Sequence, residues 1–577
     1  MAVRVRVPLA ALPKFFYVMK KKIFISLSAC SLLILSSCSK LGALSSDNFT
    51  VTPNPLETQG GQVPATINGT FPEKYMKKKA TVTVIPELRY SNGLVKKGSG
   101  ATFQGENVFG NSQTVSYRMG GHYTMKTSFG YEPEMQKSDL YVTFNAFIGK
   151  KKVNIPAVKV ADGVIATSEL YKKTLMNGGA CIALDSFQRV NAQKQEANVR
   201  FLINQANLRS NELKNNSIHE FVQMLKKINA DRTGLNIKNV EVQAYASPEG
   251  GFSFNDKLAS KRQDVSESYV KQQLKQSKVS TDIDAHYTAQ DWDGFQKLVQ
   301  ASKIQDKDVI LRVLSMYKDP QQREEQIRNM SEGFRELADG ILPELRRSRL
   351  IINYETVGRS DDQIKAQYAS DPTKLGVEEM LYAASLENDA AKKQEIYNKA
   401  AEYYDKDYRA YNNLAALAFN EGDEATAKRY IAQSLSKNEK APEANANLAL
   451  IALKKGDLTE AENYLAEAID ANGFSKVLGN LNIAKGNYSH AQDELSKSTD
   501  NSAALAQILN KDYASAKATL DNIKNADAMT SYLHAILSAR QGNKYAADSY
   551  LKEAVKKDPS LAGYAAKDLE LSILNKQ

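Results

Sequence analysis

The side chains most able to do chemistry, histidines, cysteines and paired acids, are few in this sequence and scattered along it. The histidines fall in separate segments, and no HExxH or similarly paired spacing is present to hold zinc. They are His122, His219, His286, His490 and His534. The GxxxxGK[ST] loop that cradles phosphate and the GxSxG elbow that exposes a nucleophilic serine are also missing. We therefore expect a protein that is not an enzyme and that uses no cofactor and no metal.

An acid pair and a lone cysteine could be interpreted as catalytic, but each has a simpler structural explanation. Asp291 and Asp293 flank the single tryptophan, Trp292, and are easily drawn as an acid–base dyad. Acids are also stabilised at the N-terminus of a helix, where the helix dipole is positive, and this explains the pair more simply. The sequence contains no CxxC pair for redox or zinc chemistry, so we interpret Cys181 as a buried, inert thiol.

The N-terminal segment has the layout of a secretory signal. From Met19 it reads MKKKIFISLSACSLLILSSC, with lysines before an apolar run. The apolar run, Ile23–Leu35, is shorter than the ~20 residues that cross a bilayer, which disfavours the alternative of a single-pass anchor. The tetrapeptide LSSC resembles a bacterial lipobox, so we predict a signal peptide over residues 1–37 and lipidation at Cys38. Met1–Tyr17 add a second basic and apolar stretch, which indicates an upstream start codon taken in error.

Length and charge limit the remaining possibilities. A chain of 577 residues is too long for one hydrophobic core, so several domains are expected. Residues 1–37 hold six lysines and arginines and no acid, and their removal lowers the net charge from +10 to +4. This modest charge does not support nucleic-acid binding. Residues 38–47 are small and polar and are predicted to form a tether between the lipid and the first domain.

Periodicity then divides the mature chain into three parts. Alternating β-rich runs separated by glycine and asparagine predict an antiparallel β-sandwich over residues 48–165. Strands at Val199–Ile203, Val240–Tyr245 and Arg349–Tyr354 alternate with helices, which predicts a βαβ-type domain over residues 195–358. Residues 292–345 are too long and too helical for a turn and are interpreted as a helical insertion.

The C-terminal part carries an internal repeat. A leucine, an alanine, a glycine and a second alanine recur 34 positions later, which is the tetratricopeptide period. The pairs are Leu414 and Leu448, Ala415 and Ala449, Gly422 and Gly456, and Ala427 and Ala461. Similar residues return near Gly486 and Gly542, whereas Asn501–Leu520 is degenerate. The sequence therefore predicts a solenoid of paired helices over residues 377–570, and a multidomain α+β protein overall.

One stretch of the βαβ-type part resembles a known family. The strand and turn Val242–Gly250 read VQAYASPEG and are followed at helical spacing by Asn255, Leu258, Arg262 and Val265. Together with Phe201–Leu208 and Arg346–Tyr354, these residues resemble the C-terminal domain of the outer-membrane protein A (OmpA-like) family, over residues 195–358 apart from the insertion. The resemblance implies an α/β sandwich that grips peptidoglycan.

The resemblance also implies a ligand site, with one substitution. In the family an aspartate at the end of the second strand and a helix arginine clamp the zwitterionic end of diaminopimelate. Arg262 fills the arginine position, but Ser247 stands at the aspartate position and cannot pair with an ammonium as an anion can. Removing one partner of such a buried charge pair costs about 2 to 5 kcal/mol of binding free energy. We therefore expect the clamp to bind diaminopimelate only weakly unless another carboxylate takes the place of the aspartate.

Three neighbouring assignments stay open on the sequence alone. Glu249 is either a substitute carboxylate for the clamp or a solvated turn acid beside Pro248 and Gly250. Arg262 is either a ligand-binding residue or a structural arginine that bonds loop carbonyls. Asn255 is expected to cap the following helix more than to touch a ligand.

The whole arrangement is similar to envelope lipoproteins of Bacteroidetes. We expect a non-enzymatic, lipid-anchored scaffold at the outer membrane, on its periplasmic face more than on the cell surface. Its repeat helices should form a groove that the protein itself cannot fill and that binds other envelope proteins. The alternative function is a peptidoglycan anchor that links the outer membrane to the cell wall through the OmpA-like part. An outward-facing protein would exclude that alternative.

Overall fold

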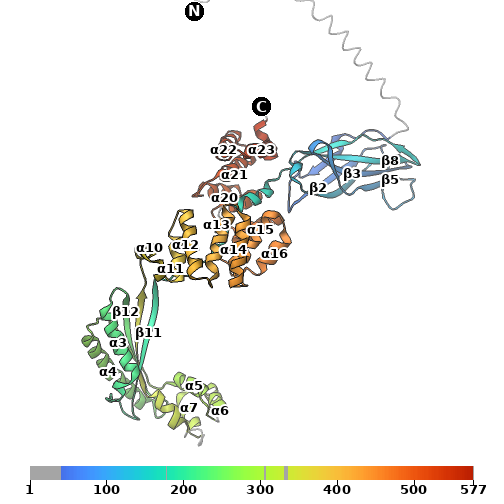
Figure 1. Cartoon of the computed structure of the whole chain (residues 1–577). Helices are drawn as coiled ribbons and strands as arrows, with labels where there is room; N and C mark the ends of the chain where they lie inside the picture. Colours follow the sequence, from blue (N-terminus) through green and yellow to red (C-terminus); the bar gives the residue numbers. More distant parts are fainter. Residues whose placement is uncertain (1–40, 177–178, 305–306, 330–335, 576–577) are drawn as a thin grey trace, which may run out of the picture. The chain divides into compact units, whose positions relative to one another are not determined.

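The computed structural model describes residues 41–575 except 177–178, 305–306 and 330–335. The predicted signal peptide, residues 1–37, and the predicted lipidation site, Cys38, lie outside the described residues. The chain divides into two compact units, one formed by Met1–Leu184 and Asp389–Gln577 and the other by Asp185–Asn388. The fold mixes α and β structure, with a sheet region near the N-terminus and a C-terminal helical repeat region that resembles tetratricopeptide solenoids (Figure 1). Within the described ranges, no helix is long and apolar enough to cross a bilayer.

The first unit begins with two β-sheets that share one core. Strands β1, β2 and β7 form one sheet, and β10, β8, β3, β5 and β6 form the other, with β4 on β3 and β9 on β8. Their bounds are β1 Phe49–Thr52, β2 Gln62–Phe71, β3 Ala80–Tyr90, β4 Leu94–Lys97, β5 Ala101–Gly105, β6 Gln113–Val115, β7 Gly121–Gly130, β8 Ser138–Ile148, β9 Lys151–Val153 and β10 Val158–Gly163. Alternate side chains such as Val63, Ile67, Val82 and Leu140 are fully buried between the sheets.

Two details of this region differ from the sequence-based expectation. Strands β5 and β6 pair in parallel, although an antiparallel arrangement was expected throughout. Part of the predicted tether is packed, because Leu41 and Leu44 are buried in the same core and the Gly42 carbonyl accepts a hydrogen bond from Tyr75. The reason is that apolar leucines gain free energy when they are removed from water into that core.

The helical repeat region completes the first unit. Successive helices pair as α13 with α14, α15 with α16, α17 with α18, α19 with α20, and α21 with α22. The bounds are α12 Ala390–Tyr403, α13 Tyr408–Asn420, α14 Glu424–Lys437, α15 Pro442–Lys455, α16 Leu458–Ala466, α17 Phe474–Lys485, α18 Tyr488–Glu494, α19 Asn501–Leu509, α20 Tyr513–Asp521, α21 Ala528–Arg540, α22 Lys544–Lys557, α23 Leu561–Ala565 and the 3-10 segment η8 Leu569–Asn575. Small alanines at the helix crossings, such as Ala415 and Ala449, are fully buried.

The turn inside each helix pair explains why one repeat was hard to find. Gly422, Gly456, Gly486 and Gly542 all have positive φ angles, a conformation that glycine adopts without strain. In the pair formed by α19 and α20 the same turn position is Lys511, with φ of 64°. The span Asn501–Leu520 therefore keeps the helix pair while it lacks the glycine that marks the other repeats.

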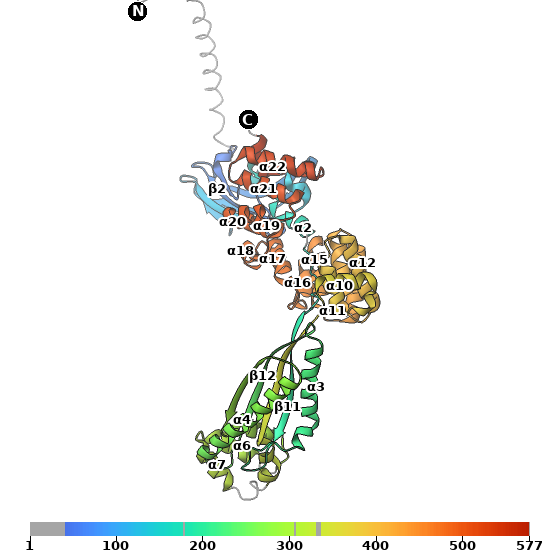
Figure 2. The same ribbon diagram turned by 90° about the vertical axis from the view of Figure 1, so that its left-hand side faces the viewer.

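The second unit is a four-stranded sheet with helices on one face. The strand order is β11-β14-β12-β13, with β12 and β13 parallel and the other pairs antiparallel. The bounds are β11 Val190–Arg200, α3 Asn216–Ala230, β12 Leu235–Tyr245, α4 Phe252–Gln276, β13 Asp282–Thr288, β14 Arg347–Val357, α10 Asp361–Ser370 and α11 Val377–Ser385. Helices α3 and α4 lie along the sheet (Figure 2). Phe221 and Leu225 of α3 and Val270 of α4 are buried in one core with Val240, Val242 and Leu350 of the strands.

The strands of this unit correct two expectations. The first strand was expected at Val199–Ile203, but β11 ends at Arg200 and Phe201–Ile203 belong to the loop that follows. The loop is needed because the Leu202 carbonyl points to Arg262 instead of a neighbouring strand. Strand β13 was not predicted, since its alternation is weak and most of its side chains are polar and exposed.

Helices occupy the chain between β13 and β14. They are α5 Trp292–Ala301, α6 Lys307–Met316, α7 Pro320–Arg328, the π-helical segment η6 Leu337–Ile341 and α9 Leu342–Leu345. These helices have a small core of their own, formed around Phe295, Val299, Ile310 and Leu345. Asp291 caps α5 by accepting a hydrogen bond from the Gly294 N–H at 2.8 Å, which confirms the helix-terminus interpretation of this acid.

Candidate functional site

Arg262 lies on α4 and is almost completely enclosed, with 1% of its surface exposed. Its Nε, Nη1 and Nη2 donate to the main-chain carbonyls of Gln205, Tyr245 and Leu202 at 3.0, 2.9 and 3.2 Å. The Phe201 ring covers the guanidinium at 4.9 Å. Burial and the nearby Arg346 lower the pKa of Arg262 to about 10, so it remains a cation at neutral pH. This geometry favours the structural interpretation, because the guanidinium already binds three loop carbonyls.

Glu249, the candidate substitute carboxylate, also has partners within its own unit. Its Oε1 accepts from Arg346 Nε at 2.8 Å and from Arg346 Nη2 at 2.6 Å, and both side chains are largely buried. The Ser247 hydroxyl donates to the same oxygen at 2.9 Å, and Ser247 is 5% exposed. Glu249 is therefore neither a solvated turn acid nor an open carboxylate. It binds an arginine that precedes the last strand.

Asn255 lies inside α4 and does not cap it. The residue at the N-cap of α4 is Gly251, which has no capping side chain. The Asn255 amide instead donates to the carbonyls of Ser247, Glu249 and Gly250 at 3.0, 3.0 and 3.1 Å. This corrects the expectation of a helix cap, because the amide reaches back over the turn and holds its main chain in place.

The structure therefore brings Ser247, Glu249, Asn255 and Arg262 together, but each of them bonds to protein. The turn also bonds to the helical segment, since the Gly250 N–H donates to Glu324 at 2.9 Å. A ligand with a carboxylate and an ammonium would have to displace several buried charge-assisted bonds, which are costly to break. These four residues therefore fix the turn between β12 and α4.

A second candidate site lies in the repeat region, which we call the repeat groove. It is the surface of α13, α15, α17 and α19 that contacts the chain between the β-sheets and the second unit. We call that chain, residues 167–176 and 179–184, the strap. It contains the 3-10 segment η4 Thr167–Leu170 and helix α2 Tyr171–Thr174, followed by an extended part.

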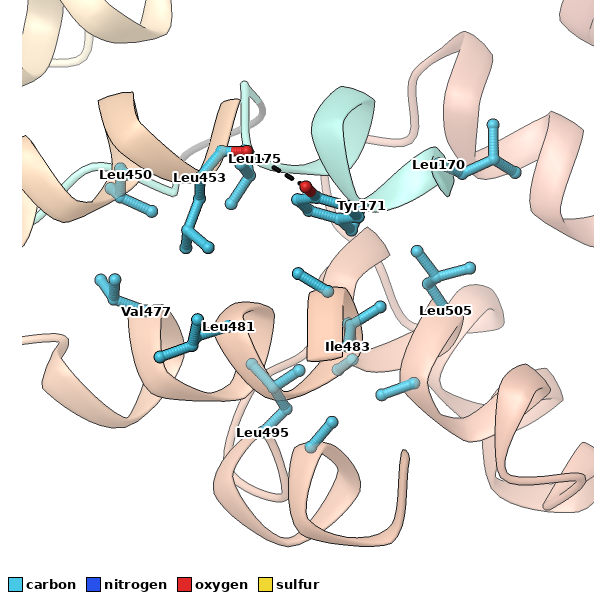
Figure 3. Packing of buried hydrophobic residues seen from close by; sticks show 14 of the residues in the cluster. Leu170, Tyr171, Leu175, Leu450, Leu453, Val477, Leu481, Ile483, Leu495 and Leu505 are labelled. Atoms are coloured by element: carbon cyan, nitrogen blue, oxygen red, sulfur yellow. Dashed lines mark hydrogen bonds between the residues drawn. The ribbon is translucent and has the colours of Figure 1, made fainter. Parts of the chain in front are cut away.

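The helical part of the strap is packed by apolar contacts. Leu170, Tyr171 and Leu175 are 1%, 3% and 0% exposed and belong to the same core as the repeat helices. Figure 3 shows these three side chains facing Leu450 and Leu453 of α15, Val477, Leu481 and Ile483 of α17, and Leu505 of α19. The Tyr171 hydroxyl donates to the Leu453 carbonyl at 3.2 Å. The strap is thus an integral part of the core of the repeat region.

The extended part of the strap is held by asparagine side chains. The Cys181 N–H donates to Asn447 Oδ1 at 2.7 Å, and Asn447 Nδ2 donates to the Cys181 carbonyl at 2.9 Å. Two residues further on, Ala183 makes the same two bonds with Asn413, at 2.8 and 3.1 Å. Asn472 donates to the Ile182 carbonyl at 2.9 Å. All these bonds are to main chain, so they recognise an extended backbone and not particular side chains.

The asparagines are joined to one another, which fixes their orientation. Asn412 Nδ2 donates to the Cys181 carbonyl at 3.0 Å and to Asn413 Oδ1 at 3.1 Å, and Asn447 Nδ2 donates to Asn412 Oδ1 at 3.0 Å. Asn412, Asn413 and Asn447 are at most 1% exposed. A buried amide that already has partners loses little freedom on binding a backbone, so the row is preorganised.

The expectation that the protein cannot fill its own groove is therefore wrong. The reason is that the chain between the β-sheets and the second unit carries apolar residues at helical spacing and an extended part long enough to follow the groove. The sequence contained a signal that was missed. Asn413 and Asn447 are 34 residues apart, so they occupy the same position of successive repeats.

Cys181 is buried, and two tyrosines of the repeat region, Tyr408 and Tyr411, have hydrogen-bond partners within that region. The Cys181 thiol is 2% exposed, and burial raises its pKa to about 12, as expected for an inert thiol. Tyr408 donates to Glu443 at 3.3 Å and Tyr411 to the Ala401 carbonyl at 3.2 Å, both within the repeat region. Among the described residues, no group of three or more histidines, cysteines or acids is arranged to hold a metal ion.

Comparison with known proteins finds weak likeness to repeat proteins. No protein-family model and no curated protein matches the chain. A tetratricopeptide repeat protein from Parabacteroides merdae is similar, with 15% identity, a TM-score of 0.27, and coverage of 37% of this chain and 91% of that one.

Two further solved structures are similar at the same level. The APC/C hetero-tetramer Cut9–Hcn1 has 15% identity, a TM-score of 0.29, and coverage of 37% of this chain and 44% of that one. Yeast Tom70 has 13% identity, a TM-score of 0.20, and coverage of 60% of this chain and 81% of that one. The tetratricopeptide character of the helical region therefore rests on its own helix pairs and turns.

Proposed function

We propose that this protein is a non-enzymatic scaffold of the cell envelope whose repeat groove binds an extended polypeptide by its backbone. The observation that carries the proposal is the pair of reciprocal bonds from Asn447 to Cys181 and from Asn413 to Ala183. In this structure the bound polypeptide is the strap. The repeat region therefore acts first as an intramolecular clamp on the chain that joins the β-sheets to the second unit. Other envelope proteins bind surfaces that the strap leaves open.

Lipid anchoring at Cys38 is the second element of the proposal. It is supported by the lipobox-like LSSC sequence that follows a signal-like segment. If Cys38 carries lipid, only Ser39 and Lys40 separate it from Leu41, which is buried in the β-sheet core. The β-sheets then lie directly at the membrane surface, and the proposed location is the outer membrane, on its periplasmic face.

The alternative function, a peptidoglycan anchor, finds no supporting observation in the geometry around Arg262. The guanidinium is enclosed and Glu249 is bound to Arg346. We therefore place adhesion to proteins before adhesion to the cell wall.

Two measurements on the full chain test the clamp and the anchor separately. Hydrogen exchange of the Cys181 and Ala183 amides should be as slow as that of the repeat helices, and fast exchange of both amides would rule out the clamp. Membrane fractionation of cells should find the protein in the outer membrane and the Cys38→Ser variant in the soluble fraction. Retention of that variant in the membrane would contradict the anchor while leaving the clamp intact.

Protease treatment of intact cells tests which side of the membrane the protein faces. The proposed periplasmic location predicts that the repeat region is protected until the outer membrane is permeabilised. Digestion in intact cells would place the scaffold on the cell surface and would exclude a role at the cell wall.

A further inference from the structure

The second unit contains a cavity of about 710 Å³ that is separate from the turn around Arg262. Helices α3 and α4 cover one face of the four-stranded sheet, and the cavity lies on the opposite face. Its walls come from the ends of the strands, the turn between β13 and α5, the first two turns of α5, and Glu344 of α9. A volume in this range is typical of sites for small molecules.

The strand side chains that border the cavity are mostly polar, namely Glu196, Asn198, Arg200, Thr288, Arg347 and Arg349 together with Tyr245. Asn198, Arg349, Gln243 and His286 form one row across all four strands, as the strand register shows. Arg349 binds Glu196 through two bonds of 2.7 Å and donates to Gln243 at 3.3 Å. A polar sheet face with ordered donors and acceptors offers hydrogen bonds in fixed directions.

The charges around the cavity are balanced and mostly paired. The ion pairs are Arg349 with Glu196 at 2.7 Å, Arg347 with Asp291 at 3.0 Å, and Arg200 with Glu344 at 2.6 Å. Lys297 and Asp293 on the first turns of α5 add one charge of each sign. An anionic or cationic ligand would have to compete with these ion pairs. An apolar ligand would exclude water from the charged groups without replacing the hydrogen bonds that water makes to them.

The lining also contains two aromatic side chains beside the charged groups, and the Arg323 guanidinium lies 5.7 Å from the centre of the Trp292 ring. Tyr245 and Trp292 both border the cavity, and the Arg347 guanidinium stacks on the Tyr245 ring at 4.9 Å. Aromatic rings pack against the C–H faces of a sugar ring, while adjacent carboxylate and guanidinium groups accept from and donate to its neighbouring hydroxyls. A peptide is a poorer fit, because the cavity lies on a sheet face and not on a strand edge with unpaired main-chain groups.

We propose that this cavity binds an uncharged oligosaccharide. The hydroxyls of the sugar bridge the paired arginines and acids without breaking the pairs, and Tyr245 and Trp292 border its rings. The cavity is large enough for about two or three sugar units on the scale of typical ligand sites. The site is independent of the clamp in the repeat groove.

The test uses the full chain, purified in detergent, and titration calorimetry. The neutral probes are cellotetraose, maltotetraose and a mannose tetramer, which represent different biological sources. Sialyllactose and a heparin-derived disaccharide are the charged comparison, and a diaminopimelate-containing tetrapeptide is the peptide comparison. Saturable binding of at least one neutral probe is expected. Binding of none of them, or tighter binding of a charged or peptide probe, overturns the proposal.

Two tryptophan variants locate the binding. Thr288 is exposed and borders the cavity at the end of β13, so Thr288→Trp should fill the cavity and weaken binding at least 10-fold. Ser280 is exposed just before the other end of β13 and away from the cavity lining, so Ser280→Trp is the matched control and should bind like wild type. Equal melting temperatures would show that both variants fold. Unchanged binding by Thr288→Trp would contradict the assignment of this cavity.

Discussion

Asn447 and Cys181 form a reciprocal pair in which the Cys181 N–H donates to Asn447 Oδ1 at 2.7 Å and Asn447 Nδ2 returns a bond to the Cys181 carbonyl at 2.9 Å. An amide side chain that faces an extended backbone in this way satisfies both polar groups of one residue. Because the pair is buried, loss of the side chain leaves a backbone N–H and a carbonyl without these partners, in a place where water does not replace them readily.

Asn447→Ala should loosen the strap. Loss of a buried hydrogen-bond partner costs about 1 to 3 kcal/mol, so local opening of the strap should become about 30-fold more frequent. Cys181 reports on this opening, because its thiol is buried and its pKa is raised to about 12. The measurement is the rate at which a thiol reagent modifies Cys181 in the full chain.

The matched control is Asn525→Ala, at an exposed loop position of the same region. Its thiol modification rate should equal that of wild type. Equal rates in Asn447→Ala and Asn525→Ala would mean that the asparagine row does not hold the strap.

Arg262→Lys should destabilise the second unit although it conserves the charge. A lysine ammonium cannot reach three carbonyls in the planar arrangement that a guanidinium supplies. We expect a loss of about 2 to 4 kcal/mol in the free energy of unfolding of this unit, because buried carbonyls lose their donors. Chemical denaturation followed by hydrogen exchange of β12 and α4 measures it.

Arg232→Lys serves as the comparison, since Arg232 also donates to a carbonyl, that of Lys278, but at an exposed position. Its effect should stay below about 0.5 kcal/mol. Similar losses in the two variants would show that Arg262 is not the structural centre of its loop.

Wild-type protein should not sediment with diaminopimelate-type peptidoglycan sacculi. The predicted clamp residues bond to protein, with Glu249 on Arg346 and Arg262 on loop carbonyls. The pelleted fraction should equal that of a sample without sacculi. Saturable sedimentation that Ser247→Asp strengthens would instead support the wall anchor, because an aspartate there supplies the anion that pairs with a ligand ammonium.

Asp568 should make the stability of the repeat region depend on pH. Burial raises the pKa of this carboxyl to about 6, and Tyr532 donates to it at 2.7 Å. Because the folded-state pKa lies above the unfolded value of about 4, the folded chain holds the proton more tightly. The stabilisation is complete below about pH 4 and is lost as the pH rises through about 6, on the order of 3 kcal/mol in total.

Asp568→Asn should remove this dependence. The difference in unfolding free energy between wild type and Asp568→Asn should fall between about pH 4 and pH 6.5 and be constant above it, as measured by denaturation at each pH. Asp470→Asn, at an exposed turn, provides the control and should follow the wild-type profile. A constant difference across this range would contradict the raised pKa.

Lys511→Gly should stabilise the repeat region. Lys511 has a φ angle of 64°, which costs a residue with a side chain about 1 kcal/mol relative to glycine. Gly542 has the same role in the last full repeat, with open space around it, so Gly542→Ala should destabilise by a similar amount through backbone strain alone. Thermal unfolding of both variants should therefore shift in opposite directions.

The repeat region could be predicted from the sequence, because its helix pairs and turns depend on local physical chemistry. The 34-residue spacing of Leu414, Gly422 and Ala427 predicts the paired helices, because small residues and a left-handed turn are needed wherever two helices meet closely. The repeat at Lys511 could not be recognised in this way, because a lysine there adopts the turn conformation that glycine takes in the other repeats.

The partners of the polar groups were decided only by the tertiary structure. The sequence presents Arg262, Glu249 and Asn255 as a candidate ligand site, but whether a guanidinium meets a ligand or a loop carbonyl depends on segments far apart in the chain, here Leu202, Gln205 and Arg346. The occupant of the repeat groove was hidden for the same reason. Asn413 and Asn447 reveal their role only when a strap more than 200 residues away lies against them, because hydrogen bonds depend on distance in space and not on distance along the chain.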